Sequence, residues 1–470
     1  MSDLVVDIRQ KHETTCRFCG GRSLRFPVTR GDYSYFECGS CGNHRVSRTA
    51  ETVIESGGAS PIRLREVPAW LEAERRRGVQ VPLVLAKQIE AGTVPAYIER
   101  LRIRGFRSLA DVALLPGPGA NVLIGANGSG KSNVIHFFNM LSWMLKSRRL
   151  AEFVSRQGGA DDQLHGGSGT TPRLDTEIRI RTSTGRNDYR FSLVSAHTNE
   201  LLFTEESFRY SRDDLDTEAP WNHLGVGHRE ALIVEAGQGR DDGRAPEANR
   251  QTARTVTHLL RNCAAYQFHN TGSGSNFKKT SDATDHAFLR ADGGNLAAIL
   301  HWLENEDIRR YELICRHIQR VLPGFNRFEI DEKYGKVGLR WQSTHFDKTF
   351  GAHLTSDGSL RFFALATLLN LPGEMLPGVV LLDEPELGLH PKAISLVGDM
   401  IRALAGSRQI IVATQSPLLV DAFELDRVFV LEMRDGRTEL RSPDREALGD
   451  WLEEFTVGEI WQKNLLGGRP

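Results

Sequence analysis

The spacing of hydrophobic positions changes at residue 96. Residues 98–106 alternate apolar and charged side chains, as expected of a strand with one buried face. Residues 121–124 form a continuous apolar run that is typical of a buried strand, and residues 133–145 show the spacing of an amphipathic helix. From residue 96 onward the pattern therefore predicts strands and helices in alternation, an α/β fold.

Beyond this helix the pattern predicts strands, then helices, then a hairpin. Residues 150–240 contain short alternating strands, and residues 247–322 predict mixed helices. A second apolar strand covers residues 378–382, and residues 427–441 predict a β-hairpin. No sustained heptad pattern occurs in the sequence, which excludes a long coiled-coil arm. The middle of the chain is therefore expected to be a compact mixed insert.

The N-terminal part follows a different pattern. Residues 24–39 alternate like a β-hairpin with a turn near Arg30-Gly31-Asp32. Prolines break residues 51–95, which predicts a linker with one short amphipathic helix at residues 70–78. The arginine run 75–77 on that helix is interpreted as a solvated face. We therefore expect a small β-rich domain over residues 1–50 and a proline-rich linker over 51–95.

Composition and charge narrow the class of protein. The 470 residues are 40% hydrophobic and 25% charged, which excludes a disordered or fibrous chain. Lys and Arg number 59 against 60 Asp and Glu, so a uniformly basic nucleic-acid coat is excluded, although a local patch is not. No apolar stretch reaches about eighteen residues, and the N-terminus lacks the features of a signal peptide. The sequence predicts a cytoplasmic protein with no membrane partner.

Four of the six cysteines form two CxxC pairs, Cys16 with Cys19 and Cys38 with Cys41. Eighteen residues separate the pairs, a spacing typical of a zinc site. Four thiolates leave no open position for water, so the Zn²⁺ would be structural. The alternative is a redox CxxC or a disulfide pair. Cys263 and Cys315 stand alone in apolar sequence with a predicted helical pattern and are expected to be inert core residues. The small domain over residues 1–50 is therefore predicted to be a zinc ribbon. Its arginines can meet phosphates or an acidic protein, or simply form a solvated surface; these ribbon arginines are Arg17, Arg22, Arg25 and Arg45.

Residues 125–132, GANGSGKS, match the P-loop pattern between an expected strand and an expected helix. In this pattern the glycines let backbone N–H groups converge on phosphates at a helix N-terminus. Lys131 would neutralise the β- and γ-phosphates of ATP, and Ser132 would place its hydroxyl on Mg²⁺. The candidate nucleotide-binding residues are Asn127, Gly128, Ser129, Gly130, Lys131, Ser132 and Asn133.

A second candidate group follows the apolar strand 378–382. Asp383, at the strand tip, is placed to hold Mg²⁺, and Glu384 is the candidate general base for an attacking water. Two acids after a strand can instead cap a helix, but their pairing with a P-loop favours the catalytic role. Between the two groups, Ser356 begins an expected helix. It either caps that helix or helps to form an anion site for the γ-phosphate of an ATP held by another subunit.

The ordered motifs GFRSL, GANGSGKS, SDGSLRFFAL, LLDEPELGLHP and VATQSPLLVD resemble the ABC-type ATPases that include the SMC, RecF and OLD-family proteins. The resemblance covers roughly residues 96–470 and is strongest to stand-alone OLD- or RecF-like ATPases. It implies a P-loop NTPase of the ABC-head type that buries two ATP molecules between two copies, hence at least a homodimer. It also makes Ser356 and Gly358 the signature, places 389–391 in the D-loop, and places Arg107 near the adenine or ribose.

Two details depart from that family pattern. Gln415 stands where many relatives carry a histidine; an amide can bind the γ-phosphate or the attacking water but carries no charge, so slow hydrolysis is expected. The glutamine of the Q-loop is not identified, with Gln157 and Gln163 as the alternatives. The expected division of residues 96–470 is a P-loop lobe to 200, an insert over 201–330 and a signature lobe from 331.

Three functions remain open from sequence. The first is a switch ATPase that dimerises around ATP and controls a separate effector, such as a nuclease or toxin in bacterial antiphage defence. The second is a RecF-like DNA-binding ATPase for repair or sensing, motivated by the arginine row at positions 100, 102 and 104 and by the arginines of the N-terminal domain. The third is a non-catalytic scaffold that ATP merely orders.

Overall fold

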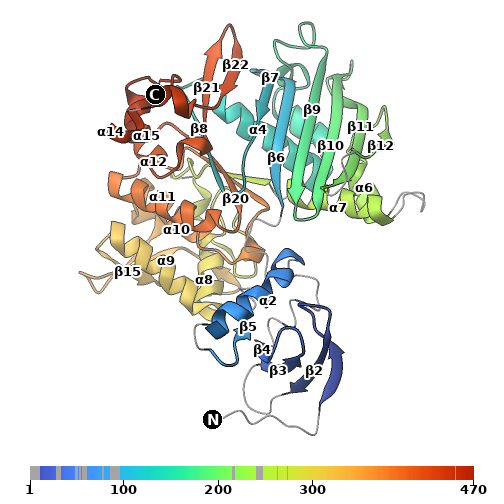
Figure 1. Cartoon of the computed structure of the whole chain (residues 1–470). Coiled ribbons are helices and arrows are strands. Elements are labelled where there is room, and N and C mark those ends of the chain that lie inside the picture. The colour runs from blue at the N-terminus through green and yellow to red at the C-terminus, as the bar shows by residue number, and fades with distance from the viewer. Residues whose placement is uncertain are drawn as a thin grey trace. The chain divides into compact units, whose positions relative to one another are not determined.

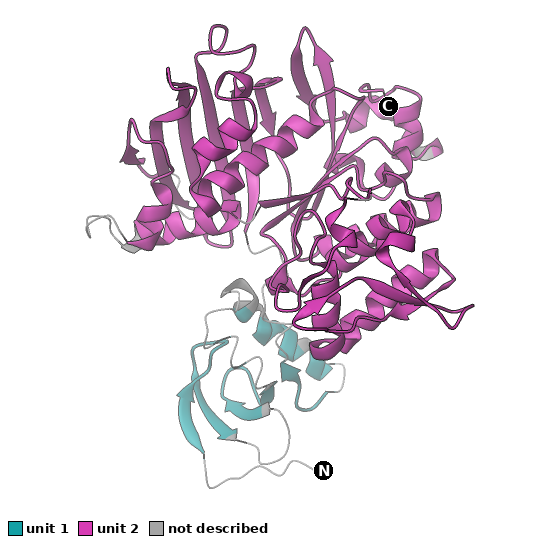
Figure 2. Ribbon diagram, turned by 180° about the vertical axis from the view of Figure 1, so that it is seen from behind, with its two compact units in different colours: residues 1–95 teal, residues 96–470 magenta. Residues whose placement is uncertain are grey.

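The computed structural model describes residues 11–27, 33–47, 51, 54, 61–76, 79–84, 96–213, 218–239, 247–261, 263–272, 274–449 and 451–469. The chain divides into two compact units, residues 1–95 and 96–470, which Figure 2 colours separately. The predicted turn at 30–32 and Arg77 lie outside the described residues. Within the described ranges, no helix is long and apolar enough to cross a membrane.

The N-terminal unit is built on one five-stranded sheet, ordered β1-β2-β3-β4-β5. Its core combines the cysteines with apolar residues of the sheet and of one helix. The elements are β1 (His12–Thr15), β2 (Arg22–Pro27), β3 (Tyr33–Cys38), β4 (His44–Ser47), β5 (Leu83–Val84) and α2 (Pro61–Arg76).

The predicted linker over residues 51–95 differs from this structure. Residues 61–76 form helix α2, much longer than the short helix expected, with Pro68 inside it. Val67 and Leu71 of α2, and Val84 of β5, are buried in the same core as the cysteines. Pro61 at the first turn suits a helix start, and burial of the apolar face offsets the hydrogen bond that Pro68 cannot make. Much of the expected linker therefore belongs to the N-terminal unit.

The C-terminal unit contains two six-stranded sheets (Figure 1). The first is antiparallel and ordered β12-β11-β10-β9-β6-β7; the second is ordered β13-β19-β20-β8-β21-β22 and is parallel except for β22. The first sheet comprises β6 (Ala96–Phe106), β7 (Leu109–Leu114), β9 (Arg173–Thr182), β10 (Gly185–Ser195), β11 (Leu201–Arg212) and β12 (Asn222–Gly225). The second comprises β8 (Ala120–Ile124), β13 (Cys263–Tyr266), β19 (Val379–Asp383), β20 (Gln409–Thr414), β21 (Val428–Arg434) and β22 (Arg437–Arg441).

Helices fill two hydrophobic cores on either side of the second sheet. Helix α4 shares one core with apolar residues of both sheets, so it lies between them. Helices α8 to α11 form the other core against the opposite face of the second sheet. The helices of this unit are α4 (Lys131–Ser142), α5 (Leu150–Arg156), α6 (Ile233–Gln238), α7 (Glu247–Arg261), α8 (Leu296–Glu306), α9 (Ile308–Val321), α10 (Asp357–Leu368), α11 (Pro391–Ala405), α12 (Pro417–Val420), α13 (Arg445–Leu448), α14 (Trp451–Glu454) and α15 (Val457–Gln462).

Small elements complete the unit. A π-helical turn, η2, continues α4 over Trp143–Ser147. The short strands are β14 (Ser281–Asp282), β15 (Phe325–Phe328), β16 (Lys336–Val337), β17 (Arg340–Ser343) and β18 (Thr349–Gly351).

The α/β class and the β-rich N-terminal unit are confirmed, and two details differ. Strand β11 pairs with β10 along almost its whole length, so the expected lobe boundary at residue 200 falls inside a sheet. Cys263 lies in strand β13 rather than in a helix, because the run 263–266 pairs in parallel with β19. Cys315 lies buried in helix α9 as expected.

Candidate nucleotide site and metal centre

The P-loop, residues 125–132, joins strand β8 to helix α4. Lys131 begins the helix, and its buried ammonium donates hydrogen bonds to the carbonyls of Gly125 and Ala126 at 2.6 and 3.0 Å. Ser129 is also buried, and no partner for its hydroxyl is found among the described residues. Ser132 is exposed at the helix start. The free N–H groups of the first turn of α4 suit an anion.

Two carboxyl groups, those of Asp383 and Glu386, lie at the end of strand β19 and in the loop that follows it. Asp383 is 3% exposed; its Oδ2 accepts a 2.6 Å hydrogen bond from the Gln267 amide, while its buried Oδ1 has no partner within the described chain. Burial raises the pKa of Asp383. It also raises the pKa of Glu386, which comes three residues later in the chain. The uncompensated oxygen of Asp383 is therefore a position that favours a cation.

Glu384 is held in an uncommon backbone conformation next to Gln415. Gln415 lies in the loop 415–416 between β20 and α12, which we call the switch loop. The Glu384 φ of 47° lies in the left-handed region, which costs a non-glycine residue conformational energy. The Gln415 amide donates to the Glu384 carboxylate and, at 2.8 Å, to Oδ1 of Asn127. Glu386 fixes this loop by accepting from the Thr414 hydroxyl at 2.6 Å and the Gln415 N–H at 2.9 Å. One network thus connects the P-loop, the β19 acids and the switch loop.

The residues present fit a nucleotide with Mg²⁺. Burial lowers the pKa of Lys131, and the carboxylates of Glu384, Asp383 and Glu386 act in the opposite direction. A lysine and a cluster of acids with two unsatisfied oxygens, one each on Asp383 and Glu386, match the opposite charges of phosphates and a divalent cation. Lys131, Ser132 and the loop N–H groups would hold the phosphates, and Asp383 with Ser132 would hold the metal.

The structure identifies a glutamine that sequence analysis missed. Gln267 follows β13 directly and contacts Asp383, whereas Gln163 and Gln157 accept hydrogen bonds from the Arg107 guanidinium. Neither of the two expected glutamines therefore contacts the acid cluster. The sequence signal for Gln267 is its position directly after the short apolar run 263–266. The sequence pattern places this run in a helical region, so the signal is easily overlooked.

Arg107 is half-buried and lies over the ring of Phe106, 5.7 Å from its centroid. Its φ is 49°, and burial lowers the pKa of its guanidinium. Asn133 turns its amide toward the Ser108 hydroxyl at 2.7 Å, so its side chain is engaged within the protein. Gly128 has open space around it.

The signature residues lie at the start of helix α10. Ser356 caps the helix by accepting the Ser359 N–H at 3.2 Å. A methyl group at Gly358 would lie 2.5 Å from the Gly388 carbonyl, so a glycine is required where this turn approaches the D-loop. Arg361 donates to the carbonyls of Leu387, Phe268 and His269. Arg361 therefore connects the signature helix to the D-loop and to the segment that carries Gln267.

The four paired cysteines converge, with their sulfur atoms all within 4.8 Å of one another. The Cys16–Cys41 and Cys19–Cys38 sulfur distances are 3.9 and 3.5 Å, and all six cysteines of the chain are free. Tetrahedral Zn–S bonds of about 2.3 Å place sulfurs about 3.8 Å apart, so the cluster has the size that zinc needs. The separations exclude disulfide bonds in this state. Burial raises the pKa of the Cys16 thiol to about 11, a cost that a bound cation would offset.

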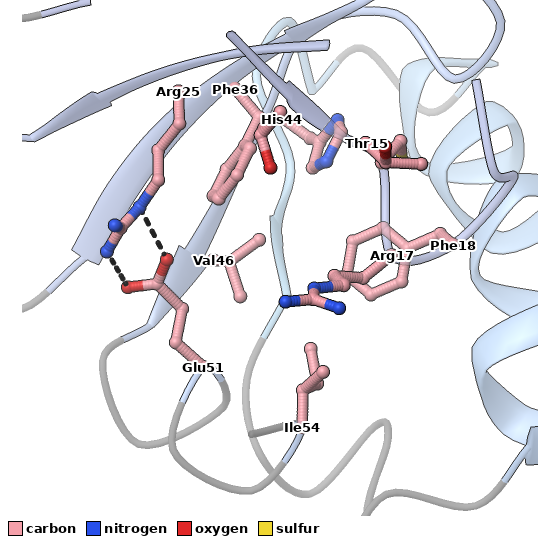
Figure 3. Close-up of a pocket in the computed structure, with 11 residues that line it drawn as sticks. Thr15, Arg17, Phe18, Arg25, Phe36, His44, Val46, Glu51 and Ile54 are labelled. Carbon is pink, nitrogen blue, oxygen red and sulfur yellow. Dashed lines mark hydrogen bonds and ion pairs between the residues drawn. The ribbon is translucent and has the colours of Figure 1, made fainter. Parts of the chain in front are cut away.

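A small cavity of about 90 Å³ lies beside Cys16 in the same unit (Figure 3). Phe18, Phe36 and Val46 contribute apolar walls, and Arg25 pairs with Glu51 at 2.9 Å. Arg45 donates to the Val81 carbonyl at 3.0 Å. Two of the four ribbon arginines are thus engaged inside the unit rather than free for phosphates.

Two arginines of the row on β6 are also paired. Arg102 contacts Asp111 at 2.8 Å, and Arg104 contacts Glu177 at 3.2 Å. The two acids come from the neighbouring strands β7 and β9. Arg102 and Arg104 therefore belong to ion pairs on the sheet surface.

A known protein family matches the part of the chain that contains the P-loop and the acids at the end of β19. A family model described as "AAA domain, putative AbiEii toxin, Type IV TA system" matches residues 120–421, which is more than half of the chain. The chain belongs to this AAA-domain family.

Curated relatives match over shorter stretches. The DNA replication and repair protein RecF of Anaeromyxobacter dehalogenans is 34% identical over 120 residues, 24% of this chain and 32% of the relative. RecF of Anaeromyxobacter sp. strain Fw109-5 is 40% identical over 104 residues, 22% of this chain and 27% of the relative. The chromosome partition protein Smc of Desulfitobacterium hafniense is 44% identical over 57 residues, 12% of this chain and 4% of the relative. The chain spans about a third of the first of these relatives. The expected relationship to RecF- and SMC-type ATPases is confirmed.

Among solved structures, the SMC head domain from Thermotoga maritima aligns over 74% of this chain and 99% of its own, at 14% identity and a TM-score of 0.41. An SMC head bound to the C-winged helix domain of ScpA aligns over 74% and 98%, at 18% identity and a TM-score of 0.49.

Proposed function

We propose that this chain is a magnesium-dependent ATPase that works as a switch: two copies close around ATP and control a separate effector. The observation that carries the proposal is the network in which Gln415 of the switch loop donates hydrogen bonds both to Asn127 of the P-loop and to Glu384 after β19. Its members come from segments almost three hundred residues apart in the sequence. Such convergence on a P-loop is expected of a site that binds and hydrolyses a nucleoside triphosphate.

Each residue has a role in this proposal. Lys131 and the N–H groups of the P-loop bind and orient the phosphates. Asp383 and Ser132 would hold Mg²⁺, which would supply charge neutralisation on the transferring phosphoryl group. Glu384 accepts the proton of the attacking water, and Gln415 orients the Glu384 carboxylate. Because Gln415 is neutral and cannot stabilise developing negative charge as a cation can, turnover is expected to be slow.

Exposed apolar residues support closure of two copies. Leu354 precedes the signature, Leu387 lies just before the D-loop and Leu418 follows the switch loop. Their exposed fractions are 56, 43 and 38%. The described side-chain hydrogen bonds of Ser356 go to Ser359, so the signature serine is available for the nucleotide of a second copy. The effector would be a toxin or nuclease, in keeping with the toxin–antitoxin wording of the family description.

The RecF-like alternative loses part of its support from the geometry. It rested on the arginines at 100, 102 and 104 and on the arginines of the N-terminal unit, and of these Arg102 and Arg104 are paired with acids of neighbouring strands. Exchanging these partners for DNA phosphates would leave Asp111 and Glu177 beside a polyanion, which is unfavourable.

Phosphate release by the wild type and by Glu384→Gln tests the ATPase directly. We expect Glu384→Gln to bind a fluorescent ATP analogue with unchanged affinity and to lose at least about a hundredfold in turnover, because only the proton acceptor is removed. Glu312→Gln, an exposed change on α9, serves as the matched control. Wild-type protein that binds ATP without magnesium-dependent turnover would instead support the non-catalytic scaffold.

A further inference from the structure

Strand β13 is the edge of the second sheet, and its outer side opens into a cleft. The strand order places β19 as its only neighbour in that sheet. In a parallel sheet, alternate residues direct their N–H and C=O groups to opposite sides. Along the part of the chain that the structure describes, the residues 263–266 receive no backbone hydrogen bond on the side away from β19. The outer edge of β13 is therefore an unpaired row of donors and acceptors.

The cleft has a volume of about 330 Å³ and runs along this edge. All four residues of β13 line it, and small residues dominate its floor: Ala264 and Ala265 from the strand, Ala287 and Ala291 from the facing loop. Small side chains let another backbone approach closely enough to hydrogen-bond with the strand edge.

The two walls differ in character. One wall comes from the end of α4, the η2 turn and the end of α7, and it carries Trp143, Lys146 and Arg261. The facing loop contributes Phe288 and Leu289. Phe288 is 47% exposed, and the Lys146 ammonium lies 4.6 Å from its ring centroid, so the two walls meet across the mouth. The lining also contains one carboxylate, Glu374, compared with two cations, Lys146 and Arg261.

We infer that this β13 cleft binds an extended segment of a partner protein by β-strand addition. A strand inserted along β13 would pair its backbone with the free edge and direct alternate side chains to the two walls. The cationic wall selects acidic side chains, and the wall with Phe288 selects apolar ones. The fitting partner is therefore an amphipathic strand in which acidic and apolar residues alternate.

The position of the cleft gives such a partner access to the acid cluster. Tyr266 ends β13, and the next residue, Gln267, contacts Asp383. A strand bound at β13 would restrain the segment that positions Gln267. This coupling rests on the proposed function, whereas the binding of the strand does not.

Fluorescence anisotropy without nucleotide tests the binding surface on the full chain. The probe is a labelled ten-residue peptide of alternating valine and glutamate, compared with alternating valine and lysine. We expect saturable binding of the valine–glutamate peptide and at least about tenfold weaker binding of the lysine peptide. Lys146→Glu should weaken the acidic peptide at least about tenfold, whereas Lys333→Glu, an exposed lysine elsewhere in this unit, should not.

Methylation of the peptide nitrogens separates backbone pairing from charge attraction. Methyl groups on the valine nitrogens block one edge of the strand, and methyl groups on the glutamate nitrogens block the other. We expect one methylated form to lose binding and the other to keep it. Equal binding of both forms, or loss of the acidic preference, would overturn the inference. ATP affinity measured on the same samples reports separately on the proposed function.

Discussion

At the residue scale, the negative charge that Asp383 needs for metal binding opposes the stability of the metal-free protein. Its carboxyl group is buried, one oxygen is bound to Gln267, and the other has no partner among the described residues. Burial raises its pKa, so the folded protein binds a proton there more readily than the unfolded chain does. Stability from this group is present at acid pH and is lost as the pH rises through the folded pKa. At neutral pH the charge that the metal needs is therefore destabilising in the metal-free protein.

Asp383→Asn should expose this conflict. We expect the metal-free variant to melt at a higher temperature than the wild type at pH 7.5. The difference should shrink as the pH falls toward about 4, where an exposed aspartate protonates. Magnesium-dependent phosphate release should fall at least about a hundredfold. Thermal melts across pH measure the first effect, with exposed Asp347→Asn as the control. A lower melting temperature at pH 7.5 would contradict it.

At the scale of elements, the C-terminal segment supports the base of the P-loop. The Gly468 N–H donates to Glu432 at 2.6 Å, and its carbonyl accepts from the indole of Trp461 at 2.8 Å. A methyl group on Gly468 would lie 2.6 Å from Val430 Cγ1 and 3.5 Å from the Cα of Gly125, the first P-loop residue. Gly468 therefore fills the space directly behind the P-loop.

Gly468→Ala should disturb the P-loop more than an equivalent change in an open turn. Gly436 also has a left-handed φ, 74° compared with 57° for Gly468, but a methyl group on Gly436 would meet no atom within 4 Å. Gly436→Ala therefore introduces similar backbone strain without a steric clash. Overpacking costs about 1–3 kcal/mol, so we expect Gly468→Ala to weaken ATP binding about tenfold or more and Gly436→Ala to leave it nearly unchanged. Titration with a fluorescent ATP analogue measures both. Equal affinities for the two variants would show that the segment does not support the loop.

The metal centre is the main element of the N-terminal unit. We expect about one zinc ion per chain, released by a strong chelator, and protease cleavage within residues 11–84 once the metal is removed. Cys19→Ser should lose the metal, while Cys315→Ser, in helix α9, should keep it. Metal analysis and limited proteolysis measure these outcomes. A chain that holds no metal while its N-terminal unit resists protease would contradict the assignment.

Local patterns predicted most elements of the C-terminal unit. The strand before the P-loop, the helix after it and the hairpin at 428–441 follow directly from apolar spacing and flanking glycines. Helix α2 is longer than the sequence pattern predicts, because prolines usually break helices, whereas burial of Val67 and Leu71 stabilises this one. Strand β13 was missed because four small and apolar residues carry no periodic signal. The contacts of Gln267 and Arg361 depend on tertiary structure, which sequence spacing does not specify.

At the scale of the whole molecule, the central claim is that ATP joins two copies of the chain. The net charge of −1 and the paired arginines on β6 leave little attraction for a polyanion, whereas exposed leucines flank the signature, D-loop and switch. The site on one chain contains a P-loop and acids but has no described contact to Ser356 or Gly358. A second copy can supply these residues.

Light scattering on Glu384→Gln tests this claim most directly. With Mg²⁺ and ATP, the variant should show twice the mass of one chain; with ADP, or with Ser356→Arg added, it should show the mass of a single chain while still binding the nucleotide. A mass that ATP does not change, in protein shown to have ATP bound, would contradict the account.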